Sequence, residues 1–176
     1  MKHILTITTL LVIYAFCVSA QEPSDSLIIY NERLQNYIHA GFMFKLGKTR
    51  EELYQNLGRP DSIAVETTNN CHVENVVDTI FTYNYSGITV QTYKGKYVNG
   101  GTLLTKVIVT DSLYKNIYDL NVGSSENEIF SVFGPPKKYK NNSIYLYEVI
   151  IGAPDGLLFY IEKGEIIKII RNYYND

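Results

Sequence analysis

The chain has 176 residues, with 16 basic and 18 acidic side chains and a formal net charge of −2. Without a basic excess, nucleic acid is an improbable partner. Only two cysteines are present, and one of them, Cys17, lies in the predicted export signal, so the exported part has no internal disulfide and its fold must rest on a hydrophobic core.

Residues 1–20 have the pattern of a secretory signal peptide. Lys2 and His3 form a basic start, a mostly apolar run of about 13 residues follows, and Val18-Ser19-Ala20 offers a cleavage site. That run is shorter than the roughly 20 residues that span a bilayer, which disfavours the alternative of an uncleaved anchor. A lipid anchor at Cys17 is disfavoured because Phe16, which is not small, precedes it. We expect a periplasmic or secreted protein.

An amphipathic helix is predicted just after the signal. Large apolar residues recur at helical spacing between Leu27 and Ile38, Ser24 or Asp25 can cap the start, and Gly41 can end the helix. A shorter counterpart is predicted within 111–119, because both segments begin Asp-Ser-Leu. We therefore divide the exported chain into a first helix-plus-sheet unit, residues 21–110, and a second unit, residues 111–176.

One motif occurs twice, at a constant offset of 76 residues. Residues 46–60 and 122–136 share the pattern aliphatic-Gly-x-Ser/Thr-x-x-Glu-aliphatic-x-x-x-apolar-Gly-x-Pro. The hydroxyl residue and the glutamate three positions later form a capping box at the start of a helix. The glycine can end that helix and the proline prevents its continuation. The motif predicts two short helices, each held by packing against a sheet.

Strands are predicted after each helix because large and polar residues alternate between glycine-containing turns. The first unit has strands at 81–86, 88–93 and 103–110, with a loop at 95–102 that contains Tyr97. The second has strands at 144–151, 157–162 and 165–173. Residues 67–74 are interpreted as a polar connection. The fold class is α+β, with two tandem units, each packing short helices on one face of its own antiparallel sheet.

The repeated motif resembles the helix motif of the small outer-membrane assembly lipoproteins (the SmpA/OmlA family). A tandem of two such units resembles the β-lactamase inhibitor protein superfamily. This resemblance, which covers most of residues 44–173, implies a helix–loop–helix on a four-stranded sheet in each unit, an envelope or secreted location, and protein binding through the open sheet face. The chain lacks the lipobox of the first family and the disulfides of the second, so inhibition of a β-lactamase is not implied.

Strand alternation assigns the predicted binding residues. If the helices cover the face that carries Tyr83 and Val107, the opposite face carries Tyr93, Lys106 and Ile108 in the first unit. In the second unit the opposite face carries Leu146, Leu158 and Ile170 together with charged and tyrosine side chains. Tyrosines, aliphatics and sparse charge favour a protein interface. The predicted partner-binding residues are Tyr93, Tyr97, Lys106, Glu148, Tyr160 and Lys168.

The sequence offers little for catalysis or metal binding. Cys71 and His72 are adjacent, so in an extended segment their side chains point opposite ways and do not form a nucleophile–base pair. Two histidines without a spaced acidic cluster do not make a zinc site. We expect a non-enzymatic binding protein without a cofactor. An envelope-assembly accessory is the second hypothesis, and an enzyme with a hidden carboxylate pair is the third.

Four aspartates begin the pattern Asp-Ser/Thr-aliphatic, which is similar to the acceptor motif for O-glycosylation of exported proteins in Bacteroidetes. The hydroxyl residues concerned are Ser26, Ser62, Thr79 and Ser112. Asp-Ser pairs also start helices and turns, so a purely structural role explains the pattern equally well.

Overall fold

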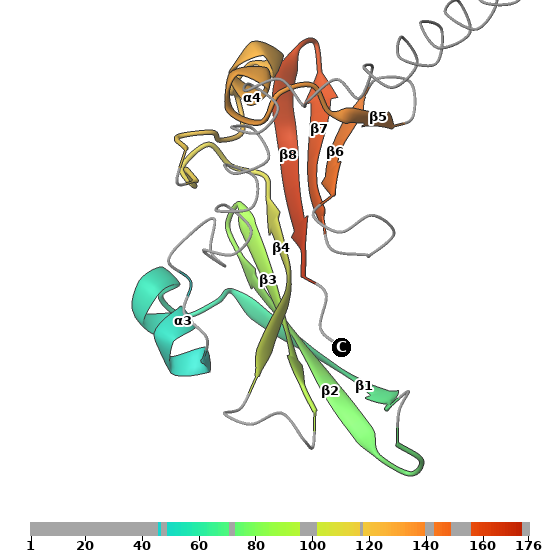
Figure 1. Cartoon of the computed structure of the whole chain (residues 1–176). Coiled ribbons are helices and arrows are strands. Elements are labelled where there is room, and N and C mark those ends of the chain that lie inside the picture. Colours follow the sequence, from blue (N-terminus) through green and yellow to red (C-terminus); the bar gives the residue numbers. More distant parts are fainter. Residues whose placement is uncertain are drawn as a thin grey trace, which may run out of the picture.

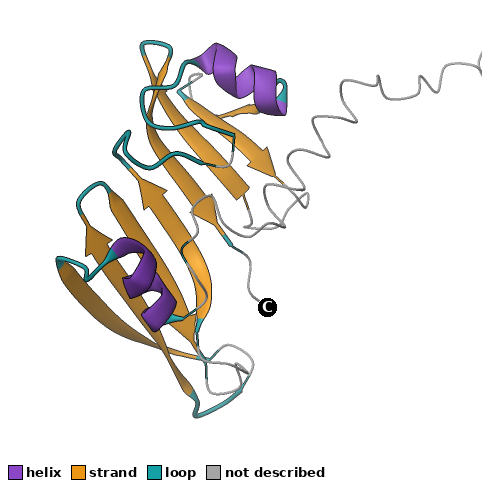
Figure 2. Cartoon of the chain, turned by 90° about the vertical axis from the view of Figure 1, so that its left-hand side faces the viewer, coloured by secondary structure: helices purple, strands orange, loops and turns teal. Residues whose placement is uncertain are grey.

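The computed structural model describes residue 46 and residues 49–70, 73–95, 102–116, 118–139, 143–148 and 156–173. The described part is an α+β fold in which two short helices lie on the same side of one antiparallel sheet (Figures 1 and 2). The predictions for the signal peptide, the helix after it, Tyr97 and the Cys71-His72 pair concern residues outside the described ones.

The two repeated motifs both form helices, as the sequence predicts. Helix α3 is Arg50–Leu57 and helix α4 is Glu126–Phe133. Each has a complete capping box, in which the hydroxyl of Thr49 or Ser125 accepts from the backbone N–H three residues later. Each also ends at a glycine, Gly58 or Gly134, with a positive φ of 81° or 71°, a conformation that favours residues without a Cβ.

The eight strands form one continuous sheet, in the order β1-β2-β3-β4-β8-β7-β6-β5, and every neighbouring pair is antiparallel. The expectation of a separate sheet for each unit is therefore wrong, because β4 pairs directly with β8. The strands are β1 Ser62–Asn69, β2 Val77–Tyr85, β3 Ile88–Lys94, β4 Leu103–Val109, β5 Lys137–Tyr139, β6 Ile144–Glu148, β7 Gly156–Glu162 and β8 Glu165–Asn172.

The joint between β4 and β8 centres on two isoleucines. Ile108 pairs with Ile170, Val107 with Arg171 and Val109 with Ile169. If each residue of β4 is matched to the residue of β8 that lies 62 positions later, Ile108 corresponds to Ile170. The pair of Val107 with Arg171 then corresponds to the pair of Val109 with Ile169. The pairing is thus symmetric about its own centre, as a local two-fold axis through the sheet would produce.

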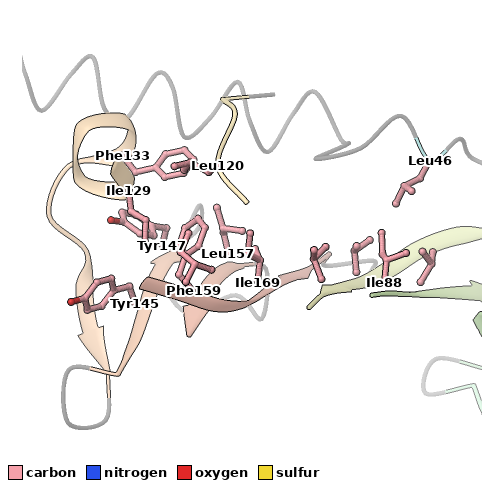
Figure 3. Packing of buried hydrophobic residues seen from close by; sticks show 14 of the residues in the cluster. Leu46, Ile88, Leu120, Ile129, Phe133, Tyr145, Tyr147, Leu157, Phe159 and Ile169 are labelled. Carbon is pink, nitrogen blue, oxygen red and sulfur yellow. The ribbon is translucent and has the colours of Figure 1, made fainter. Parts of the chain in front are cut away.

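The core lies between the helices and the sheet (Figure 3). Ile129 and Phe133 of α4 point toward the strand side chains, and the Phe133 ring lies 5.3 Å from Tyr147 and 6.0 Å from Phe159. Arg171, also buried, lies over the Tyr173 ring at 4.4 Å. Tyr83 and Val107 are buried in this core, as predicted for the helix-facing side of the strands. The other strand residues that alternate with the open side also belong to the core or pack against it: Phe81, Tyr85, Ile88, Val90 and Val109.

Several contacts of α3 with the sheet recur at α4. The carbonyl of the final glycine accepts from a strand tyrosine in each case: Gly58 from Tyr85 at 3.3 Å, and Gly134 from Tyr147 at 2.8 Å. The tyrosine two residues earlier, Tyr83 or Tyr145, contacts an aromatic ring of the helix, with centroids 6.4 Å and 5.5 Å apart.

The first residue of each helix completes the match. Arg50 donates from Nε to the Tyr83 hydroxyl at 3.2 Å, and the Tyr145 hydroxyl donates to the carboxylate of Glu126. Arg50 and Glu126 are 76 residues apart, like the two helices, and Tyr83 and Tyr145 are 62 apart, like Tyr85 and Tyr147. The first residue of each helix therefore contacts a strand tyrosine, although the chemistry of that residue differs between the two helices.

Two local predictions are wrong. Residues 62–69 form an edge strand, β1, rather than leading into a polar connection at residue 67. The described part of 111–119 forms turns instead of a helix, because Asp111 and Asn116 side chains capture backbone N–H groups. Asp111 accepts from Leu113 at 2.8 Å, and Asn116 accepts from Tyr118 and Leu120 at 2.8 and 3.0 Å. Such side-chain bonds compete with the helical ladder.

Candidate functional site

The candidate site is the sheet face opposite α3 and α4, which we call the open face. Both described helices lie on the other side of the sheet (Figure 2). Side chains alternate along each strand, so the residues between the core positions belong to the open face. In β7, for example, Leu157 and Phe159 are buried while Leu158 and Tyr160 are half-buried.

A row of four aliphatic side chains crosses the centre of the open face. Leu146 pairs with Leu158, Leu158 with Ile170, and Ile170 with Ile108, so the row passes through β6, β7, β8 and β4. Strands lie about 4.8 Å apart, which makes the row about 14 Å long. All four side chains remain partly accessible. The row is continuous only because β4 and β8 join the two halves of the sheet.

Two lysines flank the centre of this row on opposite sides. Lys106 precedes Ile108 by two residues in β4, and Lys168 precedes Ile170 by two residues in β8. Because the two strands run in opposite directions, Lys106 lies beyond one end of the isoleucine pair along the strand direction and Lys168 lies beyond the other end. The two positions are about 14 Å apart. The ammonium group of Lys168 lies over the Tyr160 ring, 3.8 Å from its centroid, a favourable cation–π contact.

Tyr93 lies on the open face but has a structural partner. It pairs with Ile80, and its hydroxyl donates to Oδ2 of Asp78 at 2.5 Å. Nδ2 of Asn70 donates to the same oxygen at 2.8 Å, and Asp78 is only 1% exposed. Removing either donor leaves a buried carboxylate short of hydrogen bonds, which is costly. Tyr93 therefore contributes to folding as well as to the surface.

Two predicted binding residues remain, Glu148 and Tyr97. Glu148 and Lys106 lie in one row across the sheet, connected by successive pairs through Gly156 and Asn172. Glu148 is in β6 and Lys106 in β4, three strands away. Three strand spacings separate the two positions by about 14 Å, so they are not neighbours on the sheet. Tyr97 lies outside the described residues. The structure thus groups Lys106, Tyr160 and Lys168 around the aliphatic row.

The candidate glycosylation positions differ in accessibility. Ser62 and Ser112 are exposed, although the Ser62 hydroxyl accepts from Nδ2 of Asn84 at 3.2 Å. Thr79 is half-buried, in β2. Ser26 lies outside the described residues.

Other kinds of site receive little support from the described residues. Among them, no cluster of three or more acidic, histidine or cysteine side chains is assembled that could hold a metal ion. No helix within the described ranges has the length and apolar character needed to cross a membrane. Comparison with protein families, with curated proteins and with solved structures finds no match.

Proposed function

We propose that the open face is a binding surface for another protein. The observation that carries the proposal is the four-residue aliphatic row, which is accessible, central and flanked by lysines and by Tyr160. A contiguous apolar row with a polar rim is the composition of a protein interface. Tyr160 and the aliphatic centre are the kind of anchors that provide most binding energy.

The open face also suits binding better than chemistry. The two lysines beside the aliphatic row, Lys106 and Lys168, are about 14 Å apart, and Asp78 is buried beneath its two donors. Proton transfer needs a titratable group within hydrogen-bond reach of a second reacting group. A non-enzymatic role therefore fits this face.

We also propose that the two halves are tandem copies of one unit. The support is threefold: the 76-residue repeat of the helix motif, the matched tyrosine contacts around α3 and α4, and the symmetric joint at Ile108 and Ile170. Duplication would explain why Lys106 and Lys168 take equivalent positions. The binding face is then formed by both copies together, and neither copy alone carries the complete aliphatic row.

We place this protein in the periplasm or outside the cell, on the strength of residues 1–20. Mass analysis of the exported protein tests this, since the expected first residue is Gln21. Recovery in the outer-membrane fraction instead would favour the envelope-assembly hypothesis over a freely diffusing inhibitor-like binder.

The binding proposal is tested by introducing charge at the centre of the row. We expect Ile108→Asp with Ile170→Asp to abolish crosslinking capture of the partner from the native host, because buried unpaired carboxylates oppose association. The matched control is Leu113→Asp, which changes an equally apolar residue that is 83% exposed and lies outside the sheet. Unchanged capture by a folded double variant would refute the proposal.

Tyrosine variants provide a second test. Tyr160→Ala is expected to weaken capture, because it removes both an anchor and the ring beneath Lys168. At position 93 both alanine and phenylalanine remove the hydroxyl that donates to the buried Asp78, so a loss of capture by either variant counts only when circular dichroism shows an intact fold. Tyr97→Ala extends the test to the loop after β3.

A further inference from the structure

Strand β1 forms one edge of the sheet and is unusually accessible. All eight residues of Ser62–Asn69 are exposed, and among the described strands β1 has one sheet neighbour, β2. Its place at the rim is visible in Figure 1. A long exposed edge strand is a ready template for pairing with another strand.

The outward backbone groups of β1 can be assigned from its ladder. The N–H of Asn70 donates to the carbonyl of Val76 at 2.8 Å, which marks the even-numbered residues as those that exchange hydrogen bonds with β2. Because antiparallel ladders alternate, the backbone groups of Ile63, Val65 and Thr67 point away from β2. These three residues offer three N–H donors and three C=O acceptors to a further strand.

The same edge exposes apolar side chains on its helix side. Ile63 pairs with Tyr83 and Val65 with Phe81, both of which pack toward the core, so Ile63 and Val65 share the helix side of the sheet. Their side chains are nevertheless 41% and 59% exposed. Val77 in β2, on the same side, is 58% exposed. The edge therefore combines unpaired backbone groups with an uncovered aliphatic strip.

Few of the devices that normally block an edge are found in β1, in which Glu66 is the one charged residue. Its sequence, SIAVETTN, contains no lysine and no proline, and its pairing with β2 runs through eight residues without a register shift. The opposite edge strand, β5, is only three residues long and includes Lys137 and Lys138. The two edge strands thus differ in length and in lysine content, and of the two described edges β1 is the one open to extension.

We propose that two copies of this chain associate through β1, antiparallel and centred on Val65. In this register Val65 meets Val65 of the second copy, and Ile63 meets Thr67. On the open face Glu66 meets Ala64 and Ser62 meets Thr68, so no like charges stand directly opposite. The outward groups of Ile63, Val65 and Thr67 all find partners, and the aliphatic strips of the two copies merge on one side.

A second copy is favoured over an unrelated extended peptide for two reasons. The strand is complementary to itself in one register that satisfies both its backbone and its side chains. The chain also already contains such a joint, since β4 and β8 pair symmetrically about Ile108 and Ile170. Association through β1 would continue one sheet across both copies, with all four described helices on the same side.

The association is expected to be weak, because one strand pair buries less than the roughly 1,200 Å² of a standard stable interface. Sedimentation velocity should therefore be run from about 10 µM to about 1 mM protein, where a monomer–dimer equilibrium is expected. Val65→Lys should weaken the dimer by about tenfold or more, since two ammonium groups would face each other at the centre. Leu113→Lys is the control, with no expected effect.

A disulfide variant tests the register directly. In a chain carrying Cys17→Ser and Cys71→Ser, Val65→Cys should form a covalent dimer on mild oxidation. A hydrogen-bonded antiparallel pair has a Cα separation of about 5.5 Å, within disulfide range. Ile63→Cys is the control, because the two Ile63 positions would be four residues out of register, about 13 Å apart.

The outcomes separate cleanly. A dimer that is weakened by Val65→Lys and crosslinked in the Val65→Cys variant, but not in the Ile63→Cys variant, supports the proposal. A monomer at every concentration, or equal crosslinking of the two cysteine variants, overturns it. Because β1 is remote from the aliphatic row, Val65→Lys should leave partner capture by the open face unchanged, so failure here is distinguishable from failure of the binding proposal.

Discussion

Phe133 provides the sharpest stability prediction, because the α4 side of the core converges on its ring. It is 4% exposed, and its centroid lies within 6.0 Å of three other rings, those of Tyr118, Tyr147 and Phe159. Truncating a buried phenylalanine to alanine costs about 3–5 kcal/mol of unfolding free energy. Part of that cost is the edge and tilted ring contacts, at about 0.5–1.5 kcal/mol a pair.

The assay is urea denaturation of residues 21–176, followed by circular dichroism. Phe133→Ala should lose about 3–5 kcal/mol, or about 10 °C in melting temperature for a chain of this size. Phe133→Leu should lose about half as much, because it keeps apolar volume but not the ring contacts. Asn127→Ala, at an exposed position on the same helix, should change stability by less than about 0.5 kcal/mol.

The equivalent residue of α3 gives the internal comparison. Leu57 stands 76 residues before Phe133, but it is only half-buried, so Leu57→Ala should cost about 1–2 kcal/mol. A loss below about 1 kcal/mol for Phe133→Ala, or an equal loss for Asn127→Ala, would refute the packing assigned to α4.

Three further predictions concern the caps, the tyrosines and modification. Thr49→Ala and Ser125→Ala should each lower the free energy of unfolding by about 1 kcal/mol in chemical denaturation, because each removes a capping-box acceptor. Burial is the main cause that raises the pKa of Tyr85 and Tyr145 to about 12. The unfolded chain then loses these hydroxyl protons near pH 10, whereas the folded chain keeps them until about pH 12. The stability that the two tyrosines contribute should therefore be constant below pH 10 and fall between pH 10 and 12. The melting temperature, measured across this pH range, follows the change. Tyr145→Phe should reduce that fall, and an unchanged slope would contradict the assignment. Intact-mass analysis of the protein from its native host should show added sugar if the exposed Ser62 is an acceptor, and an unmodified mass would dispose of that hypothesis.

The local elements were accessible from sequence because each carries its own signal. The capping box, the glycine and the proline determine where α3 and α4 begin and end. Alternation and tight turns predict the hairpins of β2 with β3 and of β7 with β8. The open-face positions of Lys106 and Tyr160 follow from the same alternation, since they depend only on which face the helices cover.

Non-local features were not accessible in this way. Neither face of β1 is covered, so its alternation does not continue past Val65 and its second half has the composition of a polar connection. The pairing of β4 with β8 joins residues 60 to 66 apart, and no local pattern encodes it. For that reason the sequence could place Ile108 and Ile170 on an open face without showing that they meet. The structural partner of Tyr93, the buried Asp78, was missed because β2 begins at Val77, whereas the strand was predicted to begin at residue 81.

Position-specific photocrosslinking in the native host tests the binding face most directly. A photoreactive residue at Ile170 should produce one dominant protein adduct, and the same residue at Asn127, exposed on α4, should not. Adducts that form equally from both positions, or only from Asn127, would contradict the assignment of the open face as the surface that meets a partner.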